Sequence, residues 1–318
     1  MPRHPDFVPQ GVIPAVLLPF RADFSIDEPS FRAHLRDVAS VQGLSAITVN
    51  AHSTEVASCT LDEQRRVMKI AGEEVGGKLP IIHGVWADGS LEAARIARQA
   101  QAGGASALLV FPPAPFTLGQ SVEMALAHFR TIAEASDLPL IVFQYPLSTG
   151  QGYPAATLER LFDEVPTIRA IKDWTAQVPQ HESQIRALQG RKRPINVLST
   201  NSAWLLSSLV LGCNGLLSGS GSVVADLQAK LYRAVKSNDL AEARRLNDRI
   251  YPTARVFYAD PFVDMHNRMK EALVLLGKLP RAVVRPPLVK ITEAEVARIR
   301  DALIEAGLLD ARAARDAA

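Results

Sequence analysis

A lysine at the end of an apolar run is the residue of this sequence best suited to covalent chemistry. Lys172 closes the run 168–172 and is followed by Asp173. If the run is a buried strand, desolvation disfavours the ammonium form of Lys172, lowers its pKa and frees an amine that can attack a carbonyl carbon. The alternative is a solvated lysine at a strand end, and the pattern of residues leaves both interpretations open.

Other side chains that can move protons also stand at the ends of apolar runs. His52 follows the run 46–49, and Tyr145 follows the run 140–143. Histidine has an ordinary pKa near 6.5 and suits proton transfer at neutral pH, although it can equally cap a turn. Tyr145 is either a second proton carrier or a packing aromatic. We interpret His83 as a hydrogen-bonded polar group of the core.

Eight short apolar runs supply the strands that would position these groups. They are near-continuously apolar, as expected when both faces of a strand are buried in a parallel sheet. They occupy residues 12–18, 46–49, 80–83, 107–111, 140–143, 168–172, 195–198 and 215–218. Stretches with helical periodicity lie between them, one opened by the capping box at 60–63. This alternation predicts an α/β protein with a (β/α)8 TIM barrel, whose active site lies at the C-terminal ends of the strands.

A doubly wound open sheet is the alternative architecture. That fold usually carries a glycine-rich phosphate-binding turn after its first strand, whereas Pro19-Phe20-Arg21 follow the first run here. From residue 239 onward the pattern is helical, and Thr292-Glu293-Ala294-Glu295 reads as a helix start. We therefore predict a (β/α)8 barrel over residues 1–236 and a C-terminal helical subdomain over residues 237–318.

Composition limits the classes of function. The formal net charge of +2 and the aromatic content of 6% make neither nucleic acid nor an acidic membrane surface an expected partner. The sequence has no apolar run of membrane-spanning length, no signal-peptide pattern and no metal-ligand motif. Its two cysteines, Cys59 and Cys213, do not make a disulfide framework. We expect a soluble cytoplasmic protein without a bound metal.

Taken together, five motifs resemble the dihydrodipicolinate synthase and N-acetylneuraminate lyase family of Schiff-base (class I) aldolases. Residues 51–55, Ala-His-Ser-Thr-Glu, resemble the family's Gly-Thr/Ser-Thr-Gly-Glu turn, and residues 60–63 its next helix start. Residues 143–146, Phe-Gln-Tyr-Pro, correspond to Tyr-Asn-x-Pro. Residues 170–173, Ala-Ile-Lys-Asp, correspond to the Schiff-base motif Gly-Ile-Lys-Asp/Glu, and residues 285–288 to Arg-x-Pro-Leu. The match extends from about residue 11 to about residue 308.

The resemblance implies a role for each of these sites. Lys172 would condense with a small-molecule 2-oxo acid, most often pyruvate, and the imine would serve as the electron sink, so that no cofactor is needed. The Ser53 hydroxyl and the N–H groups of Ser53 and Thr54 would bind the carboxylate. Further substrate contacts would come from the later strand ends, at Phe143, Thr200, Asn201, Leu217 and Ser218.

Departures from the family pattern bear on the substrate. The tyrosine that relays protons in the family is Phe143 here, and phenylalanine cannot transfer a proton. Ser148 stands in place of the arginine with which synthases bind the carboxylate of their second substrate, and Pro-Pro-Ala at 112–114 replaces a tyrosine pair. We therefore expect a protein other than a true dihydrodipicolinate synthase, in which His52 or Tyr145 carries protons instead.

The sequence thus predicts a Schiff-base-forming lyase. It would act as an aldolase or a dehydratase on a 2-oxo acid, such as pyruvate with an aldehyde or a 2-keto-3-deoxy sugar acid. Loss of the tyrosine relay leaves one alternative open, a barrel that binds a 2-oxo acid without turnover, as a sensor or a degenerate paralogue. The resemblance also implies a homotetramer built as a dimer of dimers.

Overall fold

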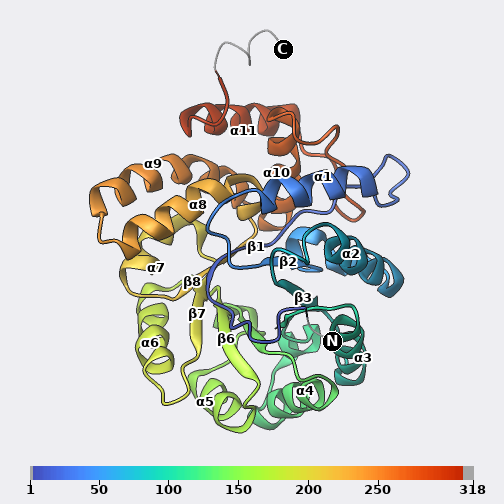
Figure 1. Cartoon of the computed structure of the whole chain (residues 1–318), viewed down its shortest axis with the longest axis vertical. Helices are drawn as coiled ribbons and strands as arrows, with labels where there is room; N and C mark the ends of the chain where they lie inside the picture. The colour runs from blue at the N-terminus through green and yellow to red at the C-terminus, as the bar shows by residue number, and fades with distance from the viewer. Residues whose placement is uncertain (1–2, 311–318) are drawn as a thin grey trace.

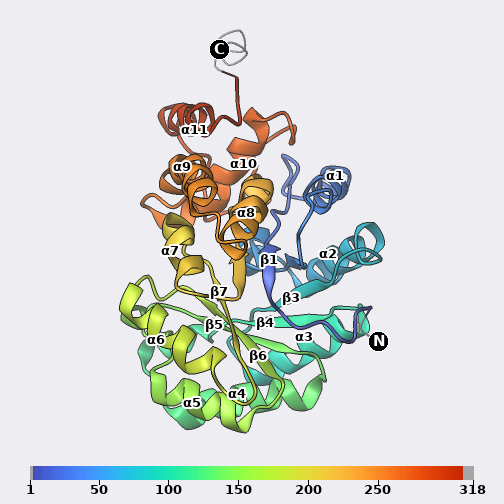
Figure 2. The ribbon, with the colours of Figure 1, turned by 60° about the vertical axis from the view of Figure 1, so that its left-hand side comes forward.

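The computed structural model describes residues 3–310 and contains eight parallel strands that surround a common axis (Figures 1 and 2). They are β1 (Gly11–Pro14), β2 (Ile47–Val49), β3 (Ile81–Val85), β4 (Ala107–Val110), β5 (Leu140–Gln144), β6 (Ile168–Asp173), β7 (Asn196–Ser199) and β8 (Gly215–Ser218). Hydrogen-bonded neighbours run in the order β1-β8-β7-β6-β5-β4-β3-β2. Bridges from Val12 to Leu44 and from Ala15 to Thr48 lie between β1 and β2. The predicted (β/α)8 barrel is confirmed, and the doubly wound alternative is wrong.

Helices follow the strands and form the outer layer of the barrel. They are α1 (Glu28–Ala39), α2 (Leu61–Glu74), α3 (Ser90–Ala102), α4 (Val122–Ala135), α5 (Ala155–Glu164), α6 (Val178–Gln189), α7 (Leu205–Val210) and α8 (Gly221–Lys236). The capping box predicted at the start of α2 is confirmed. The Thr60 hydroxyl accepts from the Glu63 N–H, and the Glu63 carboxylate accepts from the Thr60 N–H.

The strands are buried on both faces because the barrel has an inner and an outer core. Ile13 and Leu217 point into the barrel interior, whereas their chain neighbours Val12 and Leu216 pack beneath the surrounding helices. Successive side chains of a strand point to opposite faces. Burial of both faces explains why the runs are near-continuously apolar.

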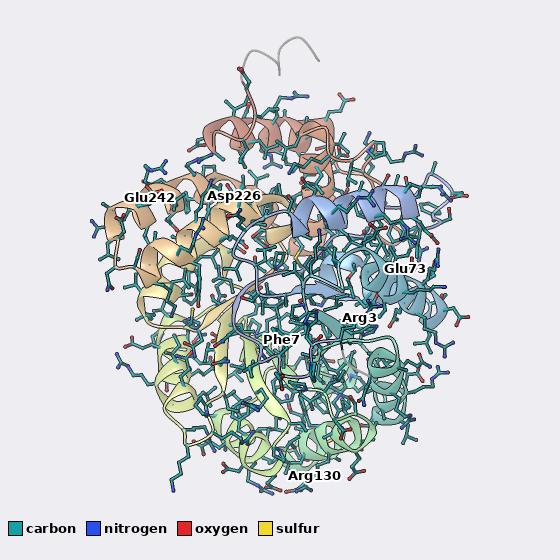
Figure 3. All side chains as sticks on the ribbon, in the orientation of Figure 1. Arg3, Phe7, Glu73, Arg130, Asp226 and Glu242 are labelled. Atoms are coloured by element: carbon teal, nitrogen blue, oxygen red, sulfur yellow. The ribbon has the colours of Figure 1, made fainter. Side chains whose placement is uncertain are left out.

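Many charged side chains of the helices lie on the outside of the helical layer. Figure 3 shows Glu73 of α2 and Arg130 of α4 at the outer edge, whereas Phe7 lies over the barrel and packs against its interior core. Within residues 3–310, no helix is both long enough and apolar enough to cross a bilayer.

Three further helices gather at one end of the molecule, beyond α8 and α1 (Figures 1 and 2). They are α9 (Leu240–Phe257), α10 (Met265–Leu275) and α11 (Glu293–Glu305), and the short helix η6 (Phe262–Asp264) joins α9 to α10. Helix α9 packs on α8, and α10 contacts the turn that follows β2. The predicted C-terminal helical region is confirmed. The domain boundary predicted after residue 236 falls between α8 and α9.

Candidate active site

A pocket of about 180 Å³ lies at the C-terminal ends of the strands. Lys172 lines it from the end of β6, Ser53 from the turn after β2, and Asn201 from the loop after β7. Phe262 of η6 lines it from the C-terminal region. The pocket therefore lies where an active site is expected in this type of barrel, and the C-terminal helices contribute to its wall.

Lys172 is a buried amine without a counter-ion in the part of the chain that the structure describes. Its side chain is 4% exposed, and burial lowers its pKa from 10.5 to about 7. Within residues 3–310, Nζ makes no hydrogen bond or ion pair, and it lies 3.9 Å from the centre of the Phe143 ring. A large share of the amine is therefore uncharged at neutral pH and able to act as a nucleophile. This geometry favours the nucleophilic interpretation of Lys172 over the solvated one.

The turn after β2 brings free hydrogen-bond donors into the same pocket. Ser53 is buried and lines the pocket, and its hydroxyl and N–H have no acceptor within residues 3–310. A Cβ added to Gly219 would come within 2.6 Å of Ser53 Oγ, so the glycine permits this close approach. The Thr54 N–H instead donates to Ala51 O (3.1 Å), and its hydroxyl also bonds the Ala51 backbone. Of the donors predicted to bind the substrate carboxylate, the hydroxyl and the N–H of Ser53 are therefore free within residues 3–310, whereas the Thr54 N–H is engaged.

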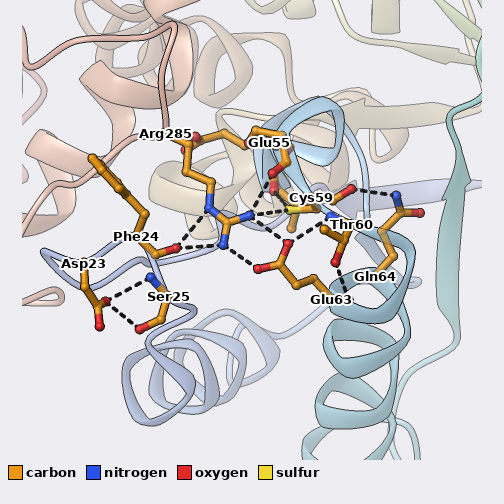
Figure 4. A network of polar contacts seen from close by, with 11 residues as sticks. Asp23, Phe24, Ser25, Glu55, Cys59, Thr60, Glu63, Gln64 and Arg285 are labelled. Atoms are coloured by element: carbon orange, nitrogen blue, oxygen red, sulfur yellow. Dashed lines mark hydrogen bonds and ion pairs between the residues drawn. The ribbon is translucent and has the colours of Figure 1, made fainter.

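A charged network beneath this turn fixes its shape (Figure 4). The turn carries two non-glycine residues with positive φ, Asn50 (52°) and Glu55 (51°). This conformation costs free energy, so it persists only where the surrounding structure imposes it. The buried Glu55 carboxylate pairs with Lys270 of α10 and accepts the Arg285 N–H at 3.2 Å. The Arg285 guanidinium also bonds Glu63 at 2.5 Å. The C-terminal region therefore holds the turn that presents Ser53.

His52 and Tyr145, the two candidate proton carriers, are hydrogen-bonded to each other. The Tyr145 hydroxyl lies 2.8 Å from His52 Nε2. Burial first, and then the positive charge of Lys172, hold the pKa of His52 well below its ordinary value, and burial raises the pKa of Tyr145. Both groups are therefore uncharged at neutral pH. When His52 Nε2 carries the proton and donates to Tyr145, Nδ1, which has no partner within residues 3–310, is a free acceptor.

The remaining predicted contacts divide into two sets. Thr200 and Asn201 line the pocket, and the Asn201 side chain donates to Asp173 O at 3.2 Å. Leu217 lies instead in the barrel interior. Ser218 lies in a buried hydrogen-bonded cluster with Ser202, Ser220 and Gln228. Direct substrate contacts from Leu217 and Ser218 stay predictions.

His83 of β3 is hydrogen-bonded to the residue that follows β2. His83 Nδ1 donates to Gly84 O (2.7 Å), so that Nε2 accepts from the Asn50 side chain at 2.8 Å. Asn50 is one of the two turn residues with positive φ. This supports the interpretation of His83 as a structural polar group.

Sequence reasoning missed the side chains that the C-terminal region adds to the site. Tyr258, Phe262 and Met265 line the pocket. His266 lies behind His52 with a ring-centre distance of 6.5 Å, and burial with the charges of Lys270 and Lys172 lowers its pKa to about 3. The sequence offered one sign of this contribution, the aromatic residues Tyr258 and Phe262 in the short segment between two stretches of helical periodicity. Trp174, which directly follows β6, also lines the pocket.

The fold and the site together define a class of protein. Within the part of the chain that the structure describes, no three histidine, cysteine, aspartate or glutamate side chains are arranged to hold a metal ion. A (β/α)8 barrel with a buried, low-pKa lysine at its mouth is the arrangement of a lyase of the class I aldolase type, in which the lysine forms an imine with the substrate.

Comparison with known proteins gives the family. Residues 8–306 match the dihydrodipicolinate synthetase family, and the chain belongs to it. Its members are lyases of the class I aldolase type that bind pyruvate on a lysine and use no external cofactor.

Relatives and solved structures agree with this assignment. The 4-hydroxy-tetrahydrodipicolinate synthase of Sphingopyxis alaskensis is 32% identical over 302 residues, covering 94% of this chain and 99% of the relative. The enzyme of the same name from Nitratidesulfovibrio vulgaris is 31% identical over 301 residues, with the same coverage. YagE is a prophage protein of the dihydrodipicolinic acid synthase family from E. coli K12, and its structure is a complex with pyruvate. It superposes on this chain with a TM-score of 0.86 at 26% identity. The match covers 94% of this chain and 99% of YagE. A monomeric dihydrodipicolinate synthase variant has the same fold, with a TM-score of 0.87, 24% identity and coverage of 94% and 97% of the two chains.

Proposed function

We propose that this protein is a Schiff-base-forming lyase that acts on a 2-oxo acid, as an aldolase or a dehydratase. The observation that carries the proposal is Lys172, a buried amine with a pKa of about 7 and no counter-ion within residues 3–310. The free hydroxyl and N–H of Ser53 line the same pocket. An uncharged amine attacks a ketone carbonyl, and short donors at a turn suit the adjacent carboxylate.

In the proposed aldolase reaction, Lys172 Nζ attacks C2 of the 2-oxo acid, and loss of water gives an imine. The C3–C4 bond then breaks, its electron pair moves into the imine, and the C4 hydroxyl loses its proton. His52 Nδ1 accepts that proton, and the resulting imidazolium donates to the Tyr145 oxygen through Nε2. Protonation of the enamine and addition of water release pyruvate and restore Lys172. Dehydration would use the same imine: C3 loses a proton to give the enamine, and the enamine then expels the C4 hydroxyl, which leaves with a proton as water.

Two positions favour a reaction other than that of the synthases whose name the relatives carry. The Phe143 ring lies 3.9 Å from Lys172 Nζ, at the position of the family's relay tyrosine, and offers no proton. Ser148 stands where synthases bind a second carboxylate with arginine. We therefore propose that the substrate is an adduct of pyruvate and an aldehyde, rather than the substrate pair of lysine biosynthesis.

A second candidate function rests on the same phenylalanine. If His52 does not replace the relay tyrosine, the pocket would bind a 2-oxo acid on Lys172 without turning it over. The protein would then be a sensor or a degenerate paralogue of the enzymes.

Reductive trapping tests the proposal. Incubation with pyruvate and sodium borohydride is expected to increase the intact mass by one pyruvic acid less one oxygen atom, with the adduct on Lys172. Lactate, which has no ketone, serves as the control and should give no adduct. Absence of an adduct with pyruvate would contradict both the aldolase and the dehydratase. An adduct without pyruvate release from any of a panel of 2-oxo acids would favour the sensor.

His52→Ala is expected to lower kcat about 10²–10⁴-fold, the usual contribution of a positioned general base, while trapping of pyruvate on Lys172 persists. Tyr145→Phe should cause a smaller loss, because it removes only the hydrogen bond to His52. Tyr153→Phe is the matched control, since the buried Tyr153 hydroxyl has no partner within residues 3–310. Steady-state rates of pyruvate release measure all three, and unchanged turnover in His52→Ala would remove His52 from the mechanism.

We also propose a cytoplasmic homotetramer. The support is the family resemblance, and the alternative to be tested is a monomer, the state of one dihydrodipicolinate synthase variant of the same fold. Light scattering of the purified protein gives the mass of the assembly directly.

A further inference from the structure

Three aromatic side chains form one continuous wall of the pocket, which we call the aromatic wall: Trp174, Phe262 and Tyr258. The Trp174 and Phe262 rings stack with centres 4.9 Å apart and an interplanar angle of 18°. The Phe262 and Tyr258 rings stack at 5.6 Å and 26°. Tyr145, the partner of His52, meets Trp174 edge-on at 5.2 Å. The wall therefore reaches from the proposed proton carrier into the C-terminal region.

The segment between Tyr258 and Phe262 is held in place by one buried arginine. Arg268 of α10 is 1% exposed. It donates to the carbonyl oxygens of Ala259 at 2.5 Å, Asp260 at 3.2 Å and Pro261 at 3.2 Å. At the other end, the Tyr258 hydroxyl accepts the Ser220 N–H at 3.1 Å. The wall is thus preorganised, so that a ligand that stacks on it does not have to order it.

The pocket offers little to a charged or heavily hydroxylated substrate tail. Among the residues that line it within 3–310, Lys172 is the one that carries formal charge at neutral pH, because burial keeps His52 uncharged. The Asn201 side-chain N–H and the Ser202 hydroxyl are already engaged with protein groups, whereas the Thr200 hydroxyl and Asn201 Oδ1 make no hydrogen bond within residues 3–310. Among these lining residues, a second carboxylate would find no further cation, and a chain of hydroxyls would find no carboxylate acceptor.

We propose that the aldehyde handled by this site carries an aromatic ring, which stacks on the aromatic wall while its carbonyl faces the imine. This inference rests on the proposed Schiff-base function. In the synthetic direction, the enamine of pyruvate and Lys172 forms a bond from C3 to the aldehyde carbon, and the aldehyde oxygen takes up a proton. Addition of water to the imine then releases a 4-aryl-4-hydroxy-2-oxo acid and free Lys172. Cleavage is the reverse, so neither direction needs an oxidant or a reductant.

The test compares three aldehydes with pyruvate as co-substrate: benzaldehyde, glyceraldehyde and succinic semialdehyde. We expect kcat/KM for benzaldehyde to exceed that for the other two by up to about tenfold, the factor that aromatic stacking supplies. Borohydride trapping of pyruvate is measured on the same preparation. Trapping with a preference for glyceraldehyde or succinic semialdehyde, or with no reaction of any aldehyde, would overturn the aromatic assignment alone. Absence of trapping would overturn the proposed function as well.

Variants of the wall make the test specific. Phe262→Ala is expected to raise KM for benzaldehyde about tenfold with a smaller change in kcat, because it removes the central ring of the wall. Phe262→Tyr keeps a ring and should restore most of the affinity. Val263→Ala, next in the chain and 56% exposed, is the matched control and should leave KM unchanged. Equal KM values in Phe262→Ala and Val263→Ala would contradict stacking on the wall.

Discussion

Lys172→Met is expected to abolish both pyruvate trapping and turnover and, at the same time, to stabilise the fold. The amine is the proposed nucleophile, so no residual imine chemistry should remain. The gain in stability follows from the pKa of Lys172, which burial lowers from 10.5 to about 7. At about 1.4 kcal/mol per pKa unit, the charged form costs the folded chain roughly 4–5 kcal/mol. Methionine carries no such cost, and a gain of about 1–4 kcal/mol should raise Tm by several degrees.

The gain in stability from Lys172→Met should become smaller as the pH rises. Below pH 7 the lysine is charged in both the folded and the unfolded states, so the cost of burial is present in full. As the pH rises from about 7 toward 10.5, the folded lysine is neutral while the unfolded one still binds a proton, and the cost disappears. The difference in Tm between Lys172→Met and the wild type should therefore shrink over that range.

Lys192→Met provides the control for an exposed lysine without a partner within residues 3–310. It should change neither Tm nor turnover. If the difference in Tm between Lys172→Met and wild type did not vary with pH, desolvation of Lys172 would not be its cause. Retained turnover in Lys172→Met would contradict the Schiff-base mechanism itself.

The barrel and the position of Lys172 were predictable from the sequence because both depend on local pattern. A parallel strand buried on both faces is near-continuously apolar, so the runs in the sequence mark the strands themselves. The order of runs and helices then requires Lys172, His52 and Asn201 to meet at the same end of the barrel. The fold, the position of Lys172 and the pocket lining by Ser53 and Thr200 follow from this reasoning.

Contacts between distant segments were not predictable in the same way. The hydrogen bond between His52 and Tyr145 joins residues 93 positions apart, and strand periodicity fixes the direction of a side chain but not its partner. The aromatic wall depends on how the chain between α9 and α10 packs on the barrel mouth, which periodicity does not specify. Leu217 and Ser218 occupy a strand that the sequence located correctly, yet their side chains lie in the interior core and in a serine cluster.

The buried pair between Glu55 and Lys270 gives the second large expected effect. Glu55 is 6% exposed, Lys270 is fully buried, and Lys270 also donates to Val283 O at 2.8 Å. Within residues 3–310, Lys270→Met would leave the buried Glu55 carboxylate with the Arg285 N–H as its one remaining partner. Removing one member of a buried pair typically costs about 3–5 kcal/mol, which chemical denaturation would measure. Lys278→Met, which removes a half-exposed pair with Asp37, is the matched control and should cost at most about 1 kcal/mol.

The same substitution separates stability from function, because the pair joins α10 to the turn that presents Ser53. In Lys270→Met that turn loses one of the contacts that hold its positive-φ residues, so KM for pyruvate should rise even under conditions where the protein is fully folded. Adding Glu55→Gln removes the uncompensated charge and should recover part of the lost stability. It should not recover KM, since the glutamine does not restore the link to α10. Recovery of both quantities together would mean that the pair acts on stability alone and that the turn is held by its other contacts.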